Sequence, residues 1–495
     1  MYIAYFGEIS NPLGSLDAYI SDITVFWTKY TELEDDTMQY TNKKVTDLKI
    51  AYIGGGSRGW AWTLMNDLKK STDISGVVYL YDIDYEAAKC NEIIGNKIDG
   101  ELWKYFAAET IGEALHGANF VIISILPGTF DEMAVDVHTP EKYGIWQSVG
   151  DTAGPGGFIR GLRTVPMMRQ IAAEIRTWCP AATVINYTNP MAVCIGALYR
   201  EFPEIKAYGC CHEVFGTQKL LTHALNEITG IEAERRDICV NVVGVNHFTW
   251  FTSAKYNNID LFPVFKEFVD RFYETGYNRE GLGNWMNNSF RTDARVRMDL
   301  FRRFGYIAAA GDRHLSEFMD NDEYLASPDI VAKWTFALTT VDWRKKDLAN
   351  RLARSKRLVS GEEIYELRNT GEEGAMQIRA LLGLDTMVTN INIPNQGQIS
   401  NLPLGVIVET NAALRCDGFQ PVMAGAVPDA ILPMISRSAA ENEAILDAAF
   451  SLDLDFAYEK FRDLNMIKKL TETEKKALFD EMVSGTKEYL KDYRN

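Results

Sequence analysis

Short apolar stretches alternate with helical patterns from Lys49 to about residue 210. KIAYIGGG (49–56), GVVYLYDID (76–84) and NFVIISILPG (119–128) are typical of strands, and helical spacing separates them. Two more strand-like stretches, ATVINYTNP (182–190) and IKAYGCCH (205–212), follow further helical segments, one of them PMMRQIAAEIRTW (166–178). Strands that alternate with helices form parallel sheets with helices on both faces. The pattern therefore predicts an α/β fold whose N-terminal part, residues 46–210, is a Rossmann-like doubly wound sheet.

Beyond residue 210 the pattern becomes mixed. CVNVVGVNHFTW (239–250) predicts a strand, residues 261–304 predict aromatic-rich helices, and DTMVTNINIPN (385–395) is another apolar stretch. The last part, from Pro428, has the spacing of amphipathic helices. We therefore expect a mixed α+β catalytic and oligomerisation domain over residues 211–495.

Residues 1–37 form an extension of doubtful status. They are rich in aromatic and acidic residues and have no clear period. Met38 lies just ahead of the first predicted strand, so one hypothesis is that translation starts there. The intact mass of the natively expressed protein would test it.

Composition excludes several classes of protein. The 46% apolar and 24% charged residues are average globular usage, and a net charge of −17 argues against nucleic acid or anionic membranes as partners. An anionic substrate would need a local basic pocket. Seven cysteines without metal-finger spacing argue against a disulfide framework and favour the cytoplasm.

The first strand runs into a glycine-rich turn. Gly54, Gly56 and Gly59 form a GxGxxG motif that includes Ser57, between a predicted strand and a predicted helix. Asp82, 23 residues beyond Gly59, ends the second strand, where an acid accepts the ribose hydroxyls of NAD and repels the phosphate of NADP. The sequence thus predicts an NAD site, the alternative being a simple strand-to-helix corner.

A second turn, ILPG, contains Leu126 and follows the third strand. In a doubly wound fold this position passes beside the nicotinamide ribose. An ordinary turn at the end of a strand is the alternative.

Three polar clusters lie near predicted strand ends. They are CCHE (210–213), GVNH ending in His247, and GDRH ending in His314. A thiolate together with an imidazole suits a divalent transition metal. A buried packing cysteine and a structural histidine are the alternatives.

Several segments together resemble a known family. KIAYIGGGSRGW (49–60), DTAGPGGFIRGLRTVP (151–166), NYTNPM (186–191), CCHEVFG (210–216), GVNHFTW (244–250) and NIPNQGQI (392–399) resemble glycoside hydrolase family 4, in family order. The resemblance covers residues 49 to about 415, and the residues CHEV (211–214) are most similar to its α-galacturonidase subgroup. It implies an enzyme that uses NAD and a divalent metal, an exception to the two-carboxylate mechanism.

The resemblance also implies the chemistry and the site. NAD oxidises C3 of the sugar, C2 then loses a proton, the aglycone is eliminated and water adds, after which NAD is regenerated. Cys211 and His247 would hold the metal, usually Mn²⁺. Asn189 would bind sugar hydroxyls, Asp312 is the candidate base and His212 the candidate acid.

The substrate itself would contact Glu213, His314 and an arginine. A uronate carboxylate favours the planar fork of arginine. Arg163, Arg160 and Arg313 lie in the relevant segments, although an ordinary ion pair is the alternative for each.

Other functions remain open at this stage. An α-glucosidase or α-galactosidase of the same family would act on a neutral sugar, an NAD-linked hydroxy-acid dehydrogenase would release NADH, and an NAD-sensing regulator would lack catalysis. Family analogy further implies a homodimer or homotetramer.

Overall fold

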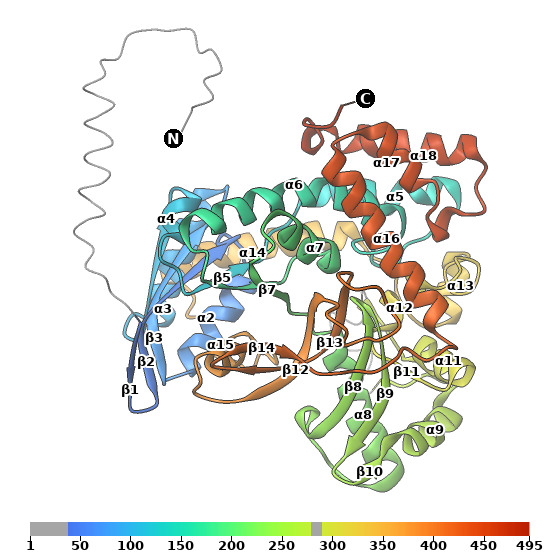
Figure 1. Ribbon diagram of the computed structural model, residues 1–495, viewed down its shortest axis with the longest axis horizontal. Coiled ribbons are helices and arrows are strands. Elements are labelled where there is room, and N and C mark those ends of the chain that lie inside the picture. The colour runs from blue at the N-terminus through green and yellow to red at the C-terminus, as the bar shows by residue number, and fades with distance from the viewer. Residues whose placement is uncertain (1–37, 279–289, 495) are drawn as a thin grey trace.

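The computed structural model describes residues 38–278 and 290–494 of the chain (Figure 1). The extension over residues 1–37 lies outside the described residues, so the hypothesis of a start at Met38 stays a prediction.

Six parallel strands form the centre of the main sheet. They are β2 (Lys44–Ile53), β3 (Ile74–Tyr81), β4 (Trp103–Ala108), β5 (Phe120–Ile123), β6 (Thr183–Asn186) and β7 (Lys206–Gly209). Their spatial order is β4-β3-β2-β5-β6-β7, the order of two mononucleotide-binding halves. A short strand, β1 (Gln39–Thr41), pairs antiparallel with β2. The predicted Rossmann-like fold is confirmed.

Helices connect these strands and cover both faces of the sheet. They are α2 (Trp60–Lys70), α3 (Tyr85–Ile98), α4 (Ile111–Leu115), α5 (Phe130–His138), α6 (Gly154–Trp178) and α7 (Met191–Glu201). One apolar core lies under α6 and α7, and another lies under α2 and α3. The carboxyl ends of the strands therefore meet at one edge of a rigid layer.

Two elements differ from the sequence prediction. Helix α6 begins at Gly154, well before Pro166, where the helical spacing starts. A Cβ on Gly157 would lie 2.3 Å from the carbonyl of Thr152, so close packing overrides the low helix propensity of glycine. Strand β4 was not predicted, because it lies at the sheet edge and its side chains are alternately buried and exposed.

The C-terminal half returns to the same sheet. β12 (Met387–Pro394), β13 (Ile407–Arg415) and β14 (Gly418–Pro421) extend it beyond β7 as antiparallel strands, with Asn392 opposite Gly209. Two helices of this half, α14 (Val341–Ser360) and α15 (Gly374–Leu381), pack on α3 and α2 respectively. The division into domains over residues 46–210 and 211–495 stays a prediction, and the two halves share one sheet.

A second, smaller sheet lies at the other end of the molecule (Figure 1). It contains β8 (Ile238–Val245), β9 (Phe248–Tyr256), β10 (Ile259–Asp260) and β11 (Ile307–Ala308). Around it lie α8 (Glu213–Thr229), α9 (Leu261–Phe272), α11 (Arg295–Phe304), α12 (Asp312–Phe318) and α13 (Pro328–Lys333). The single strand predicted over residues 239–250 is in fact part of a tight β8–β9 hairpin, with His247 in its turn. The predicted α+β character is confirmed.

The C-terminal segment is helical, as predicted. It contains α16 (Leu432–Ser451), α17 (Leu454–Phe461) and α18 (Glu472–Gly485), and α16 packs across α6 and α7 (Figure 1). Short 3-10 helices occur at Pro140–Tyr143, Arg235–Asp237, Asn465–Ile467 and Lys487–Tyr489. Among the described residues, every helix is too short or too polar to cross a lipid bilayer.

Candidate active site

The glycine-rich turn between β2 and α2 is tightly held. The amides of Gly54 and Gly55 donate to the carbonyl oxygen of Tyr81, at 2.9 and 2.8 Å, and the amide of Gly56 donates to Asp82 Oδ2 at 2.8 Å. Gly54 has a φ of +94°, and a Cβ there would lie 2.1 Å from the carbonyl oxygen of Ser124. Only glycine fits this position.

The start of helix α2 is suited to an anion. Its N-cap, Gly59, offers no side chain to the first backbone amides of the helix, and Ser57 lies in the turn just before it. A pyrophosphate group binds to such free amides at a helix N-terminus. Leu126 follows β5 on the same sheet edge and is 46% exposed. The structure thus brings the predicted cofactor residues to one edge, in an arrangement that fits a dinucleotide.

Cys211 follows β7 and its thiol is buried. Burial raises the pKa of this thiol well above its usual value, and the nearby carboxylates of Glu409 and Glu213 raise it further. A divalent cation would reverse this preference, because it stabilises the thiolate.

His247 lies in the turn of the β8–β9 hairpin and adopts the left-handed conformation, with a φ of +63°. Thr152 Oγ1 donates to Asp151 Oδ1 at 2.7 Å and lies 3.1 Å from His247 Nδ1. Since the hydroxyl proton of Thr152 is already used, Nδ1 carries the proton and Nε2 keeps its lone pair. Burial, and then the charge of His314, lower the pKa of His247 to about 3. The ring is therefore neutral, as a metal ligand must be.

His314 and Glu213 form a pair beside His247. The two imidazole centroids lie 3.9 Å apart, and His314 Nε2 lies 3.5 Å from Glu213 Oε1. Glu213 Oε2 accepts the amide of Gly311 at 2.8 Å. Burial opposes the charge on His314, but Glu213 outweighs it and raises the pKa of His314. The pair links α8 to the start of α12.

A layer of polar side chains from β12 and β13 supports Cys211, and the sequence analysis missed it. Asn390 Nδ2 donates to Glu409 Oε1 at 2.6 Å and to the carbonyl oxygen of Cys211 at 3.0 Å, while Asn246 Nδ2 donates to Glu409 Oε2 at 3.2 Å. Burial raises the pKa of Glu409 to about 7. The apolar pattern of residues 385–395 hid Asn390 and Asn392, because they alternate with isoleucines.

Several buried amide oxygens in this region have no partner among the described residues. They are Oδ1 of Asn189, Asn246 and Asn392. A buried oxygen without a hydrogen bond is costly, and a sugar hydroxyl or a bound ion would satisfy it. The described residues contain no group of three or more His, Cys, Asp or Glu side chains placed to hold a metal. A metal held by Cys211 and His247 alone would have positions open for substrate oxygens, as a catalytic metal does.

Two predicted site residues are engaged in buried ion pairs. Arg163 bonds Asp136 through both terminal nitrogens, at 2.9 and 2.6 Å, and neither side chain is exposed. Asp312 Oδ1 accepts the amide of Arg297 at 3.1 Å and lies 3.5 Å from its Nε. These contacts position α5, α6 and α11, and the substrate role of Arg163 and the base role of Asp312 stay predictions.

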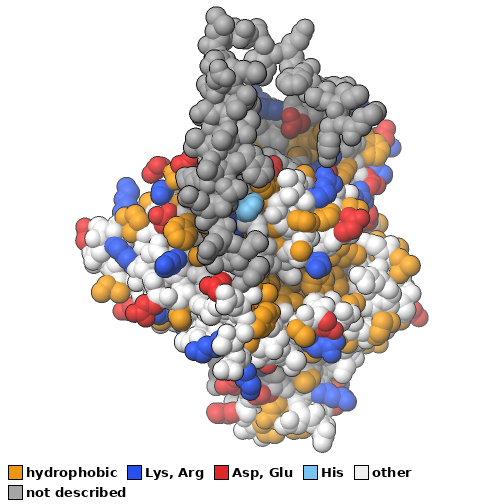
Figure 2. All heavy atoms as spheres, turned by 60° about the vertical axis from the view of Figure 1, so that its left-hand side comes forward, with side chains coloured by type: hydrophobic (Ala, Val, Ile, Leu, Met, Phe, Trp, Pro, Cys, Tyr) orange, Lys and Arg blue, Asp and Glu red, His pale blue; other side chains and the backbone are white. Residues whose placement is uncertain are grey.

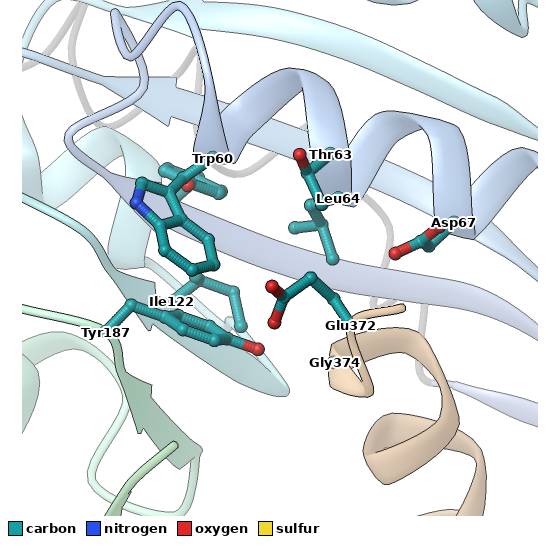
Figure 3. A pocket seen from close by; sticks show the side chains of 9 residues that line it. Trp60, Thr63, Leu64, Asp67, Ile122, Tyr187, Glu372 and Gly374 are labelled. Carbon is teal, nitrogen blue, oxygen red and sulfur yellow. The ribbon is translucent and has the colours of Figure 1, made fainter. Parts of the chain in front are cut away.

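His212 lies beside a pocket that Trp60, Tyr187 and Glu372 line, and its side chain is half exposed. Its ring centroid is 5.8 Å from that of Trp60, and its Nδ1 is 3.8 Å from Glu372. Trp60 stacks on Tyr187 with centroids 5.2 Å apart, and Glu372 reaches toward both rings from the segment before α15 (Figure 3). The pocket adjoins the glycine-rich turn, because Trp60 is the first residue of α2 and follows Gly59 directly.

Comparisons with known proteins give concordant results. The chain matches a family model described as family 4 glycosyl hydrolase over residues 49–227, and a model of the C-terminal domain of that family over residues 242–462. It is 55% identical over 463 residues to an alpha-galacturonidase of Thermoanaerobacterium saccharolyticum, covering 92% of this chain and 99% of that protein.

Solved structures agree with the fold. A putative glucosidase from Bacillus subtilis, 49% identical, superposes with a TM-score of 0.85 and covers 88% of this chain and 100% of its own. A 6-phospho-alpha-glucosidase from gut microorganisms, solved in complex with NAD and Mn²⁺, superposes with a TM-score of 0.75. It is 19% identical, covers 90% of this chain and 100% of its own, and shows the shared fold.

Proposed function

Because the chain belongs to glycosyl hydrolase family 4, we propose that it hydrolyses α-galacturonides with the help of NAD and a divalent metal ion such as Mn²⁺. The observation that carries the proposal is that Cys211 and neutral His247 are both buried and that the carboxylate of Glu213 acts electrostatically on both. Amide oxygens without a partner among the described residues add sites for sugar hydroxyls. High identity to an alpha-galacturonidase over nearly the whole chain supports the choice of sugar.

The cofactors have specific residues to hold them. The backbone of Gly54 and Gly56 and the start of α2 would take the pyrophosphate of NAD, and Asp82 its ribose. Cys211 and His247 would hold the metal. When bound, NAD supplies reversible oxidation of a sugar hydroxyl, and the metal supplies Lewis acidity. A related protein of the same fold was solved with both NAD and Mn²⁺.

Residues of the chain itself orient the sugar. The side-chain oxygen of Asn189 lies buried with no partner among the described residues, and it would accept a hydrogen bond from a sugar hydroxyl. The backbone oxygen of Asn189 accepts a bond from Arg160 Nε at 3.1 Å, which fixes the turn after β6. His314 Nδ1 is likewise buried and has no hydrogen-bond partner in the described part of the chain, and Glu213 favours the protonated ring. His314 is therefore suited to hold a proton next to a substrate oxygen.

The acid and the base belong to the proposal as well. His212 lies beside the pocket lined by Trp60 and Glu372, which would orient its ring, and it would protonate the leaving oxygen. Asp312 would act as the base only if its contacts to Arg297 opened, because burial raises its pKa while Arg297 opposes this rise.

One assay separates this function from its alternatives. Aryl α-galacturonide, α-galactoside and α-glucoside are compared side by side with NAD, Mn²⁺ and a thiol reductant. We expect hydrolysis of the galacturonide without net NADH. Hydrolysis of only a neutral sugar would refute the uronate assignment, and net NADH from a hydroxy acid would instead indicate a dehydrogenase.

We further propose a cytoplasmic homodimer or homotetramer without nucleic-acid or membrane partners. All seven cysteines are free, as expected of a reducing compartment. On the face shown in Figure 2, basic and acidic side chains are interspersed instead of gathering in one basic patch. Light scattering after gel filtration would measure the oligomeric state, and a monomer would contradict it.

A further inference from the structure

Three arginines from three helices surround Asp151, close to His247. They are Arg160 in α6, Arg313 in α12 and Arg344 near the start of α14. Asp151 interacts electrostatically with all of them, yet no ion pair within 4 Å joins any of these arginines to a described carboxylate. The region therefore holds positive charge without a close-range partner.

Within residues 38–278 and 290–494, the hydrogen bonds of the Arg313 side chain go to neutral groups. Its Nη2 donates to the carbonyl oxygen of Ser148 at 2.6 Å and to Thr339 Oγ1 at 2.7 Å, and its Nε donates to the carbonyl oxygen of Ala337 at 2.9 Å. These bonds fix the guanidinium but do not neutralise it. Arg313 thus contributes a fixed positive charge to the region.

Arg344 is the least engaged of the three. Its Nε is buried and has no hydrogen-bond partner among the described residues. The Phe290 ring is close to both guanidiniums, with its centroid 4.8 Å from the Arg313 group and 5.3 Å from the Arg344 group. A guanidinium stacked on a ring keeps its N–H edge free to bind a planar anion.

The nearby carboxylates act on the three arginines from beyond the 4 Å of an ion pair. Burial alone would raise the pKa of Asp151, but Arg160 above all holds it at about 2. Glu213 and Glu317 also act electrostatically on Arg313, and Asp347 acts on Arg344. Glu317 Oε1 accepts the amides of Val149 and Gly150, at 2.7 and 2.9 Å, and burial raises its pKa to about 7. A carboxylate bound directly to Arg344 would satisfy its Nε, which is unpartnered among the described residues, with a charge-assisted hydrogen bond.

The cluster adjoins the proposed sugar site. Thr152 bonds Asp151 on one side and contacts His247 on the other, at 2.7 and 3.1 Å. An anion at the arginines would thus lie one residue layer away from the proposed metal ligand. A pyranose whose C2 and C3 hydroxyl oxygens face His247 carries its C6 substituent at the far side of the ring, a few bonds away from those oxygens.

We propose that Arg344 is the specificity-determining residue that binds the C6 carboxylate of the galacturonide, with Arg160 and Arg313 as supporting charges. The inference rests on the proposed function and deepens it. Loss of a charge-assisted, forked hydrogen bond to a carboxylate weakens binding by about 10- to 100-fold.

The test compares three variants. Arg344→Gln removes both the positive charge and the planar guanidinium that can bind a carboxylate through two N–H groups. Arg344→Lys keeps the charge but loses that two-point geometry. Lys346→Gln is the control, because it removes a charge from an exposed residue of the same helix. Calorimetry measures the Kd of D-galacturonate, of D-galactose and of NAD for each variant, and kinetics measures KM and kcat. Melting curves verify folding, and Arg344→Lys serves if Arg344→Gln does not fold.

We expect Arg344→Gln to weaken galacturonate binding and raise KM by about 10- to 100-fold, with a smaller effect for Arg344→Lys and none for Lys346→Gln. Affinity for galactose and NAD should stay unchanged. Unchanged galacturonate binding in an active Arg344→Gln variant would overturn the inference and leave the function intact. A loss of NAD affinity instead would assign Arg344 to the cofactor and overturn it too. If the wild-type protein neither binds nor hydrolyses uronates, the proposed function fails, and the inference fails with it.

Discussion

At the scale of single residues, two adjacent cysteines have different surroundings. Cys211 belongs to the apolar core under α6 and α7, whereas Cys210 belongs to the core under α2 and α3 and accepts a hydrogen bond from Gln377 at 3.3 Å. Side chains of successive residues in an extended chain point to opposite faces. The sequence alone could not choose between the two thiols, whereas the family resemblance did.

Cys211→Ser should abolish metal-dependent turnover while NAD binding stays near normal. We expect kcat to fall by more than about 100-fold, because even groups that merely support a ligand contribute about 10- to 100-fold. Steady-state kinetics with Mn²⁺ and calorimetry with NAD provide the measurements. Cys210→Ser, which keeps the acceptor for Gln377, is the matched control and should retain activity. Full activity of Cys211→Ser would refute the ligand role.

Glu317 gives the protein a pH-dependent stability. Burial raises its pKa from 4.5 to about 7, so the folded state binds more protons than the unfolded state between these values. The free energy of unfolding therefore falls as the pH rises through this window, by up to about 1.4 kcal/mol for each unit of pKa difference. Glu317→Gln keeps an acceptor for the amides of Val149 and Gly150. The melting temperature of this variant should therefore depend less on pH between about pH 5 and pH 7.5 than that of the wild-type protein. An unchanged slope in the variant would show that Glu317 does not contribute.

At the scale of elements, helix α6 connects the nucleotide half to the site. Its first turns carry Arg160, and a buried ion pair between Arg163 and Asp136 joins it to α5. The sequence predicted only the later part of this helix, because Pro166 and several glycines look like helix breakers. Tertiary contacts make the segment before Pro166 helical, against its low helix propensity. The alternating strands and helices of residues 46–210, in contrast, follow from the local pattern alone.

Arg163→Met should destabilise the protein and leave substrate affinity unchanged. It leaves the carboxylate of Asp136 buried and unpaired, which costs about 3–5 kcal/mol. Chemical denaturation measures the loss, and KM for the galacturonide is measured on the remaining folded protein. The double variant Arg163→Met, Asp136→Leu should recover most of the stability. A stable single variant with a raised KM would instead return Arg163 to the substrate site.

At the scale of the whole molecule, the proposed site is built from segments far apart in the chain. Cys211, His247, Arg344 and Glu409 come from different elements of both sheets and of the helices around them. Motifs near strand ends predicted the first two. Arg344 lies in a highly charged helix and Glu409 in an apolar strand, so only the fold reveals their positions. The net charge of −17 likewise concealed a local cluster of arginines.

The shared sheet predicts that the N-terminal half is insoluble alone. In a chain of residues 38–230, strand β7 loses its neighbour β12, and Tyr208 loses Gln377 at 2.9 Å and the ring of Phe419 at 5.1 Å. Unpaired strand edges and exposed apolar surface promote aggregation. Centrifugation of lysates would compare this fragment with the full chain. A soluble fragment with a cooperative melting transition would contradict the expectation and support an independent domain.

The same strand pairing has a consequence during synthesis. The edge of β7 leaves the ribosome 178 residues before the first residue of β12, which is Met387. At about 5–20 residues per second, this strand waits about 10 to 40 s for its neighbour. A nascent chain in that interval exposes a nearly complete sheet with one open edge, and is a natural client for chaperones that bind apolar segments. Slower translation of residues 210–386 would lengthen that exposure and lower the yield of native protein.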